Sequence, residues 1–126
     1  MDKSIHKHFD FFWCELEAKI LDAEAEDLQK TMAWACNYIN NRQGSIEREA
    51  EQLIDDLHRI SAENRAEANR RKANIENIED PELKEMVMRF YVDRMTLEEI
   101  SFVMYCDRTT ISRKIKNYCI RHLEKG

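Results

Sequence analysis

The chain has 126 residues, 43% hydrophobic and 36% charged, with only 2 Gly and 1 Pro and a net charge of −5. Average usage would supply about 9 Gly and about 6 Pro at this length, so the residues that turns between strands need are scarce. This composition excludes collagen-like and low-complexity chains and disfavours β-sandwich and doubly wound α/β folds. It predicts an all-α protein.

The N-terminal part predicts amphipathic helices, because apolar residues recur every three or four positions. They are Ile5, Phe9, Phe12 or Trp13, Leu16 and Ile20, and then Leu28, Met32, Ala35, Cys36 and Ile39. No helix breaker lies in residues 21–27, so the two segments can also form one long helix. Gly44 then suits a left-handed C-cap, and Ser45 suits the N-cap of the next helix.

Residues 46–78 predict one long charged helix that ends before Asp80 and Pro81. Its apolar residues are spaced 4, 3, 4 and 3, like a coiled-coil seam: Ile46, Ala50, Leu53, Leu57 and Ile60. Two interpretations stay open, namely a helix packed antiparallel within the chain and a coiled coil that joins two chains. Residues 1–80 contain 11 basic and 18 acidic side chains, a net charge of −7. We expect an oligomerisation or partner-binding region, with a homodimer formed through residues 1–78.

Several kinds of site are not expected. The aromatic residues of the N-terminal part have mostly acidic neighbours, which favours core packing or a protein partner over base stacking: Phe9, Phe11, Phe12, Trp13, Trp34 and Tyr38. No Gly-rich phosphate loop, nucleophile elbow or metal-ligand spacing occurs, so neither an enzyme nor a cofactor or metal site is expected. No signal peptide and no apolar run of membrane-spanning length is present, so we expect a cytoplasmic protein without membrane contact.

Residues 81–126 predict a helix-turn-helix. Leu83, Met86, Val87, Phe90 and Tyr91 share one helix face, and Thr96 with Glu99 forms a capping box that opens a short second helix. That helix buries Leu97, Ile100 and Met104. After a connection at residues 105–107, Asp107 can cap a third helix, from Arg108 to about Glu124. The third helix buries a row of side chains four residues apart: Ile111, Ile115, Cys119 and Leu123.

The outer face of this third helix is basic, since residues 108–125 contain six basic and one acidic side chain, a net charge of +5. A helix of this kind enters the major groove with its N-terminal residues on base edges. The candidate DNA-binding residues on this face are Arg108, Thr109, Ser112, Arg113 and Lys116, and those at its flanks are Thr110, Lys114 and Asn117. Arg113 suits bidentate contact with guanine, Lys114 and Lys116 suit phosphates, and the helix start at Thr96 suits a phosphate as well.

Residues 81–123 resemble region 4 of sigma-70-type factors. The resemblance rests on Pro81-Glu82-Leu83 with Phe90-Tyr91, on residues 95–100 (MTLEEI) and on residues 108–111 (RTTI). With a long helical N-terminal part, the chain is most similar to small phage and prophage late-gene regulators of the ArpU or RinA type. The resemblance implies base reading by Arg108, Thr109, Ser112 and Arg113. Two residues depart from the pattern: Ser101 replaces the usual Ala, and Tyr105 stands where Gly commonly makes the turn, so a looser turn is expected.

Together these observations predict two regions, residues 1–80 for oligomerisation or partner binding and residues 81–126 for DNA. The expected function is a sequence-specific transcriptional regulator of phage type that binds double-stranded DNA and contacts RNA polymerase. One alternative is an assembly or adaptor protein, such as a small terminase subunit, that uses the N-terminal helices to build a ring. A minimal sigma-like factor is the third, although the acidic residues 1–80 lack the basic side chains of a promoter-melting domain.

Overall fold

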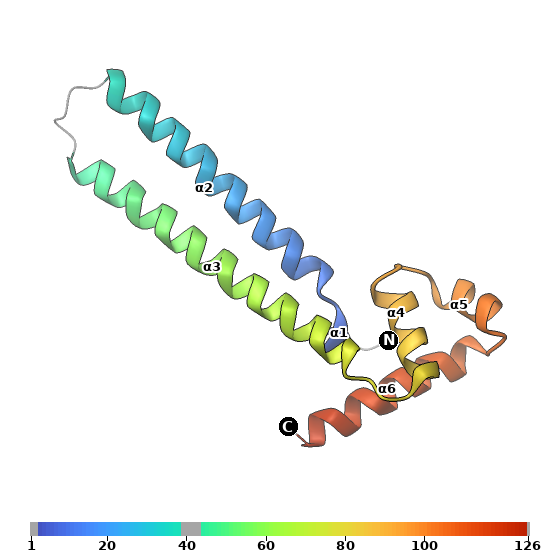
Figure 1. Ribbon diagram of the computed structural model, residues 1–126. Helices are drawn as coiled ribbons and strands as arrows, with labels where there is room; N and C mark the ends of the chain where they lie inside the picture. The colour runs from blue at the N-terminus through green and yellow to red at the C-terminus, as the bar shows by residue number, and fades with distance from the viewer. Residues whose placement is uncertain (1–2, 39–43, 126) are drawn as a thin grey trace. The chain divides into compact units, whose positions relative to one another are not determined.

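The computed structural model describes the backbone of residues 3–38 and 44–125 and the side chains of residues 6–35 and 47–122. Within these residues all regular structure is helical, which confirms the all-α prediction. The helices are α1 (Lys3–Phe9), α2 (Phe12–Tyr38), α3 (Gly44–Glu76), α4 (Pro81–Tyr91), α5 (Leu97–Met104) and α6 (Arg108–Lys125) (Figure 1).

The chain divides into two compact units, which are described separately. Residues 13–67 form one unit, and residues 1–12 with 68–126 form the other. We call them the hairpin and the C-terminal unit. The division by packing therefore differs from the expected division by function at residue 80, because the first residues and the end of α3 belong with α4, α5 and α6. The functional division itself stays a prediction.

In the hairpin, α2 and α3 lie side by side and run in opposite directions (Figure 1). The long uninterrupted α2 agrees with the lack of a breaker in residues 21–27. Helix α3 begins at Gly44, which does not have a positive φ, so the expected left-handed cap at this residue is wrong. Residues 39–43, which precede Gly44, lie outside the described residues.

The two helices meet through small side chains. Ala18 and Ala25 of α2 are fully buried, and Ile54 and Ser61 of α3, seven residues apart, are buried. The Ser61 hydroxyl donates to the Ala18 carbonyl over 3.2 Å, which satisfies a polar group that would otherwise be costly to bury. Leu53 and Ile60 of the predicted seam are exposed in the hairpin, so the buried contact with α2 runs through the neighbouring row instead. Ala50 and Leu57 of the seam are half-buried, and the side chain of Ile46 lies outside the described ones. A coiled coil between two chains stays a prediction.

A break at Asp10 and Phe11, which the apolar spacing did not predict, separates α1 from α2. The Asp10 carboxylate accepts the Phe12 amide over 3.2 Å, a local bond that competes with helix continuation. Side chains of α3 satisfy carbonyls at the end of α1: Arg71 donates to the Asp10 carbonyl over 2.6 Å, and Asn74 donates to the His8 carbonyl over 2.9 Å. These bonds hold the end of α1 in the C-terminal unit.

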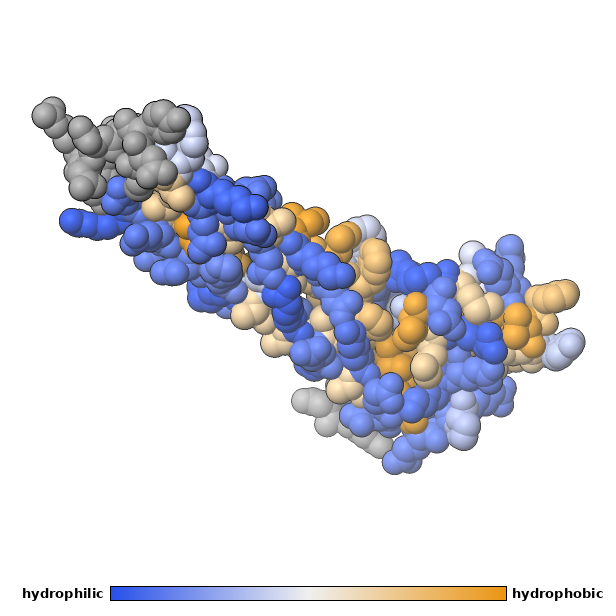
Figure 2. All heavy atoms as spheres, turned by 45° about the horizontal axis from the view of Figure 1, so that its top comes forward, coloured by the Kyte–Doolittle hydropathy of each residue, from blue (hydrophilic) through white to orange (hydrophobic). Residues whose placement is uncertain are grey.

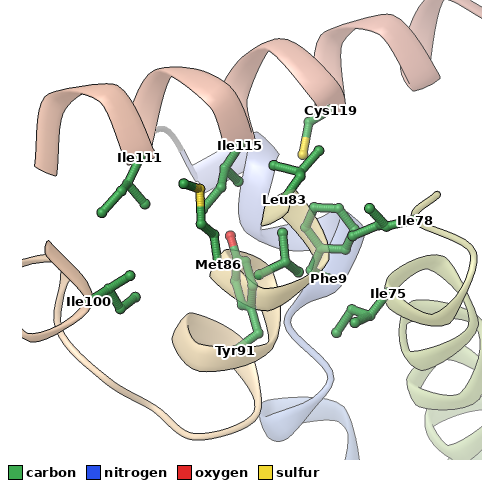
Figure 3. Close-up of a cluster of buried hydrophobic side chains, with 11 residues drawn as sticks. Phe9, Ile75, Ile78, Leu83, Met86, Tyr91, Ile100, Ile111, Ile115 and Cys119 are labelled. Atoms are coloured by element: carbon green, nitrogen blue, oxygen red, sulfur yellow. The ribbon is translucent and has the colours of Figure 1, made fainter. Parts of the chain in front are cut away.

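The core of the C-terminal unit gathers side chains from α1, α3, α4, α5 and α6 (Figure 3). Ile111, Ile115 and Cys119 point from α6 toward this core and are fully buried, as the four-residue spacing predicted. The other members are Phe9, Ile75, Ile78, Leu83, Met86, Val87, Tyr91 and Ile100. Burial raises the pKa of the Cys119 thiol to about 11, so this face of α6 is uncharged. Leu97, Phe90 and Met104 pack at the margin of the core, and the side chain of Leu123 lies outside the described ones.

Local capping fixes where α4 and α5 begin. The Asp80 carboxylate accepts the Glu82 amide over 3.0 Å, with Pro81 in the first turn of α4. The predicted capping box is present in α5, because the Glu99 amide donates to the Thr96 hydroxyl oxygen over 3.1 Å and the Glu99 carboxylate accepts the Thr96 amide over 3.5 Å. Helix α6 begins directly after Asp107, whose carbonyl accepts the Ile111 amide over 3.0 Å.

Tyr105 makes the turn between α5 and α6 in the left-handed conformation, with φ 53° and ψ 43°. The amides of Tyr105 and Cys106 both donate to the Ser101 carbonyl, the second over 3.2 Å. The expectation of a looser turn is therefore wrong at this residue, because Tyr adopts the geometry that Gly commonly supplies. Its side chain is 95% exposed, so its packing does not offset the steric cost of the backbone conformation.

We expect Tyr105→Gly to stabilise the C-terminal unit by about 1 kcal/mol, because Gly has no Cβ to clash in this conformation. The melting temperature should rise by roughly 4–8 °C, measured by circular dichroism. Tyr105→Ala is the matched control, since it removes the same exposed ring and keeps the Cβ. An equal gain from both variants would show that the ring, and not the backbone, carries the cost.

Candidate nucleic-acid interface

The buried row of α6 leaves its opposite side to solvent. Because Ile111, Ile115 and Cys119 face the core, the residues between them point outward or to the flanks. Arg108, Arg113 and Lys116 are exposed, and Ser112 is half-buried. The packing of α6 therefore presents its first two turns as a basic surface.

These residues line an open hollow of about 800 Å³ between α4, α5 and α6. Six of the nine sequence-predicted site residues meet there: Thr96, Arg108, Thr109, Ser112, Arg113 and Lys116. The hollow combines three cations with three hydroxyl groups, and the first turn of α5 lies at its edge. Such a set of donors can hold phosphate oxygens and the acceptor atoms of base edges.

The three remaining predicted residues do not line this hollow. Lys114 and Asn117 line a second one, of about 520 Å³, on the other flank of α6, together with Glu79, Asp80 and Arg121. Lys114 is also paired with Glu82 of α4 at 3.3 Å. Thr110 is half-buried and lines neither hollow. The predicted site thus separates into a main group on one flank of α6 and a smaller group on the other.

Three residues of the hollow were missed by the sequence reasoning: Phe90, Leu97 and Glu98. Glu98 matters most, because its carboxylate pairs with the Arg108 guanidinium at 3.1 Å. Both side chains are largely exposed, so the pair is screened by water and a stronger anion can displace it. The predicted capping box indicated that Glu98 lies in the first turn of α5. Sequence spacing alone, however, does not show which carboxylate faces Arg108.

The chemistry of the hollow is that of anion binding. Its described lining residues include no His, Cys or Asp. Among the side chains of residues 6–35 and 47–122 no group of three or more His, Cys, Asp or Glu is arranged to hold a metal ion. Within residues 3–38 and 44–125, no helix has both the length and the apolar character needed to cross a membrane.

Comparisons with protein-family models, with curated proteins and with solved structures gave no match.

Proposed function

We propose that the chain is a sequence-specific DNA-binding transcriptional regulator of phage or prophage type, which acts in the cytoplasm as a helix-turn-helix protein. Helices α5 and α6 form the motif, and the N-terminal half of α6 enters the major groove. This proposal extends the resemblance of residues 81–123 to sigma-70 region 4. The observation that carries it is the hollow beside α6, where Arg108, Arg113 and Lys116 gather with three hydroxyl groups.

Each group of the hollow has a proposed part in binding. Arg113 is exposed on the outer side of α6 and reads a guanine, whereas Lys116 neutralises a phosphate. The first turn of α5, opened by the Thr96 cap, offers amides to a second phosphate. On binding, the phosphate backbone takes the place of Glu98 beside Arg108. Lys114 and Asn117, on the other flank, contact the opposite side of the groove.

The proposal includes two protein partners. One basic helix contacts few base pairs, so we propose a homodimer through residues 1–78 that reads two half-sites about one helical turn apart. The acidic region before residue 80 has the composition of a protein-binding surface, and RNA polymerase is the second partner. The contacts that we propose between the hollow and DNA require neither protein partner.

To test the proposal, the purified full chain is mixed with sheared genomic DNA of the organism that encodes it, and the bound fragments are recovered. The mass of the protein is measured by light scattering. Enrichment of a few fragments by a discrete dimer is the expected result. Recovery of all fragments alike, or of none at moderate salt, contradicts the proposal. A large closed ring on the DNA would favour the packaging alternative.

Glu98→Gln sharpens this experiment. The substitution removes the carboxylate from the hollow and releases Arg108 from its 3.1 Å pair while the Thr96–Glu99 cap stays in place. We expect the same fragments to be recovered with about two- to fivefold higher affinity, the range expected for one exposed charge pair. Glu85→Gln is the control, because Glu85 pairs with Arg89 outside the hollow. A weaker affinity for Glu98→Gln would mean that Arg108 does not meet the DNA.

A further inference from the structure

The hairpin carries an apolar row that its own packing does not use. Leu53 and Ile60 of α3 are 51% and 37% exposed, although neither lies at a helix end. Ala50 and Leu57, half-buried, continue the row with alternating spacings of three and four residues. This spacing is the repeat by which one helix packs along another.

The position of the row follows from the buried residues. Leu53 and Ile60 each precede a buried residue of α3 by one position, namely Ile54 and Ser61. A step of one residue turns a helix by about 100°, so the row lies beside the contact with α2. On α2, Glu17 and Glu24 precede the buried Ala18 and Ala25 in the same way. Because the helices are antiparallel, the same step turns both rows toward one face of the hairpin.

Carboxylates therefore border the apolar row on both sides. Glu17 and Glu24 lie along its α2 edge, and both are exposed. The outer edge, on α3, carries three acids at intervals of seven residues: Glu49, Asp56 and Glu63. The positive charge of Arg59 partly offsets the negative charge of this edge, because Arg59 pairs with Asp56 at 3.5 Å and with Glu63 at 3.7 Å. We call this surface the acidic-rimmed face. It comprises the apolar row of Ala50, Leu53, Leu57 and Ile60 and the acids Glu17, Glu24, Glu49, Asp56 and Glu63. Figure 2 shows that apolar side chains interrupt the hydrophilic surface of the hairpin.

We propose that the acidic-rimmed face binds an amphipathic helix of another protein, with apolar residues at a three–four spacing and Lys or Arg on both sides. Charge complementarity selects this occupant. A second copy of the chain would place acidic edges against acidic edges when the apolar rows meet, which disfavours self-pairing here. The homodimer proposed above then uses other residues of the region 1–78. This inference goes beyond DNA recognition and does not depend on it.

The opposite face of the hairpin carries a different arrangement of charges, which supports placing the peptide on the acidic-rimmed face. There Asp22 is paired with Arg65 and lies 3.9 Å from His58. The hydrogen bond from Arg65 lowers the pKa of the Asp22 carboxyl. On this face an aspartate is paired with a cation of the hairpin, whereas the acidic-rimmed face combines an exposed apolar row with carboxylates along both edges. The second combination matches a basic amphipathic helix.

The test uses two synthetic helical peptides of three heptads, with Leu and Ile along the apolar seam and either Lys or Glu at the flanking positions. Binding to the full chain is measured by fluorescence anisotropy without DNA. We expect the Lys-flanked peptide to bind at least about tenfold more tightly than the Glu-flanked one. The double variant Leu53→Ser with Ile60→Ser should lose this binding and keep its helical circular dichroism, because both side chains are exposed. Phe102→Ser, at an exposed apolar residue of the other unit, should bind like the wild type.

Charge-reversal variants distinguish binding at the acidic-rimmed face from attraction to the negative charge of the whole chain. Glu17→Lys with Glu63→Lys should weaken the Lys-flanked peptide at least about fivefold. Glu51→Lys, on the opposite face of α3, should change its affinity less than about twofold. Equal binding of both peptides, or an equal effect of Glu51→Lys, overturns the proposal. A dimer of the wild-type chain that dissociates in the Leu53→Ser, Ile60→Ser variant overturns it too, in favour of a second copy.

Discussion

Replacing Ile111 with Asp is expected to unfold the C-terminal unit at 25 °C. Ile111 is fully buried in the core between α4, α5 and α6. Truncation of such a side chain alone costs about 2–5 kcal/mol, and an unpaired buried carboxylate adds several more. A domain with about 5–15 kcal/mol of stability does not tolerate that loss. Amide hydrogen exchange over residues 81–122 should show protection disappearing together in α4, α5 and the described part of α6.

Ile120→Asp is the matched control, because Ile120 lies on the same helix and is 41% exposed. The control should retain amide protection, and its melting temperature should fall by no more than a few degrees. DNA binding by Ile111→Asp should be lost on all sequences alike, since the surface that carries Arg113 no longer forms. Intact protection in Ile111→Asp would show that α6 does not depend on this core.

Arg113→Ala is expected to relax sequence specificity at one base position of the recovered site. A bidentate arginine–guanine contact contributes about 1–3 kcal/mol of discrimination, so specific binding should weaken by roughly 5- to 150-fold. Affinity for random DNA should change much less. The measurement is a competition assay with the recovered site and with variants of it at each base pair. Only the position read by Arg113 should lose its preference.

Lys116→Ala is expected to act differently, although Lys116 lines the same hollow. A phosphate contact carries no sequence information, so affinity should fall alike on specific and random DNA. The slope of log K against log salt should decrease by about 1. Lys84→Ala is the control, since Lys84 pairs with Glu76 outside the hollow. Parallel losses on both kinds of DNA from Arg113→Ala and Lys116→Ala would refute the division between base reading and phosphate contact.

The sequence predicted the core of the C-terminal unit well for a physical reason. Short helices that pack on one side must repeat their apolar residues every three or four positions, and Leu83, Met86 and Ile111 obey that rule. Capping is also local, so Thr96 and Glu99 could be identified from four consecutive residues. The contributions of Phe9, Ile75 and Ile78 to this core were not foreseen, because their partners are distant in the sequence.

The packing of the hairpin was harder to predict, since two rows of α3 compete for burial. The more hydrophobic row, with Leu53 and Ile60, looked like the seam, but α2 presents small side chains such as Ala18 and Ala25. The row that contains Ser61 is buried instead, with its hydroxyl satisfied by a carbonyl of α2. Hydrophobicity alone does not contain this information, because it depends on the shape and hydrogen bonding of the partner helix.

The candidate site was predicted as positions on one helix face with further positions at its flanks. Two residues turn a helix by about 200°, so periodicity separates Lys114 from Lys116. It could not show which hollows these side chains line, because the hollows depend on the neighbouring elements. Nor could it show that Glu98 pairs with Arg108. Pairings across two helices require the angle between them, which a single sequence does not specify.

The break at Asp10 has a consequence for the order of synthesis. Phe9 belongs to a core whose other members begin at Ile75 and end at Cys119, so the hairpin is inserted between two parts of one folding unit. On the ribosome, residues 13–67 emerge and can pair while Phe9 has no core to enter. The aromatic ring is therefore exposed until the residues of this core have been made. Closure of the C-terminal unit joins residues 1–12 to residues 68–119, and termination before Ile111 leaves Phe9 without the part of its core that α6 supplies.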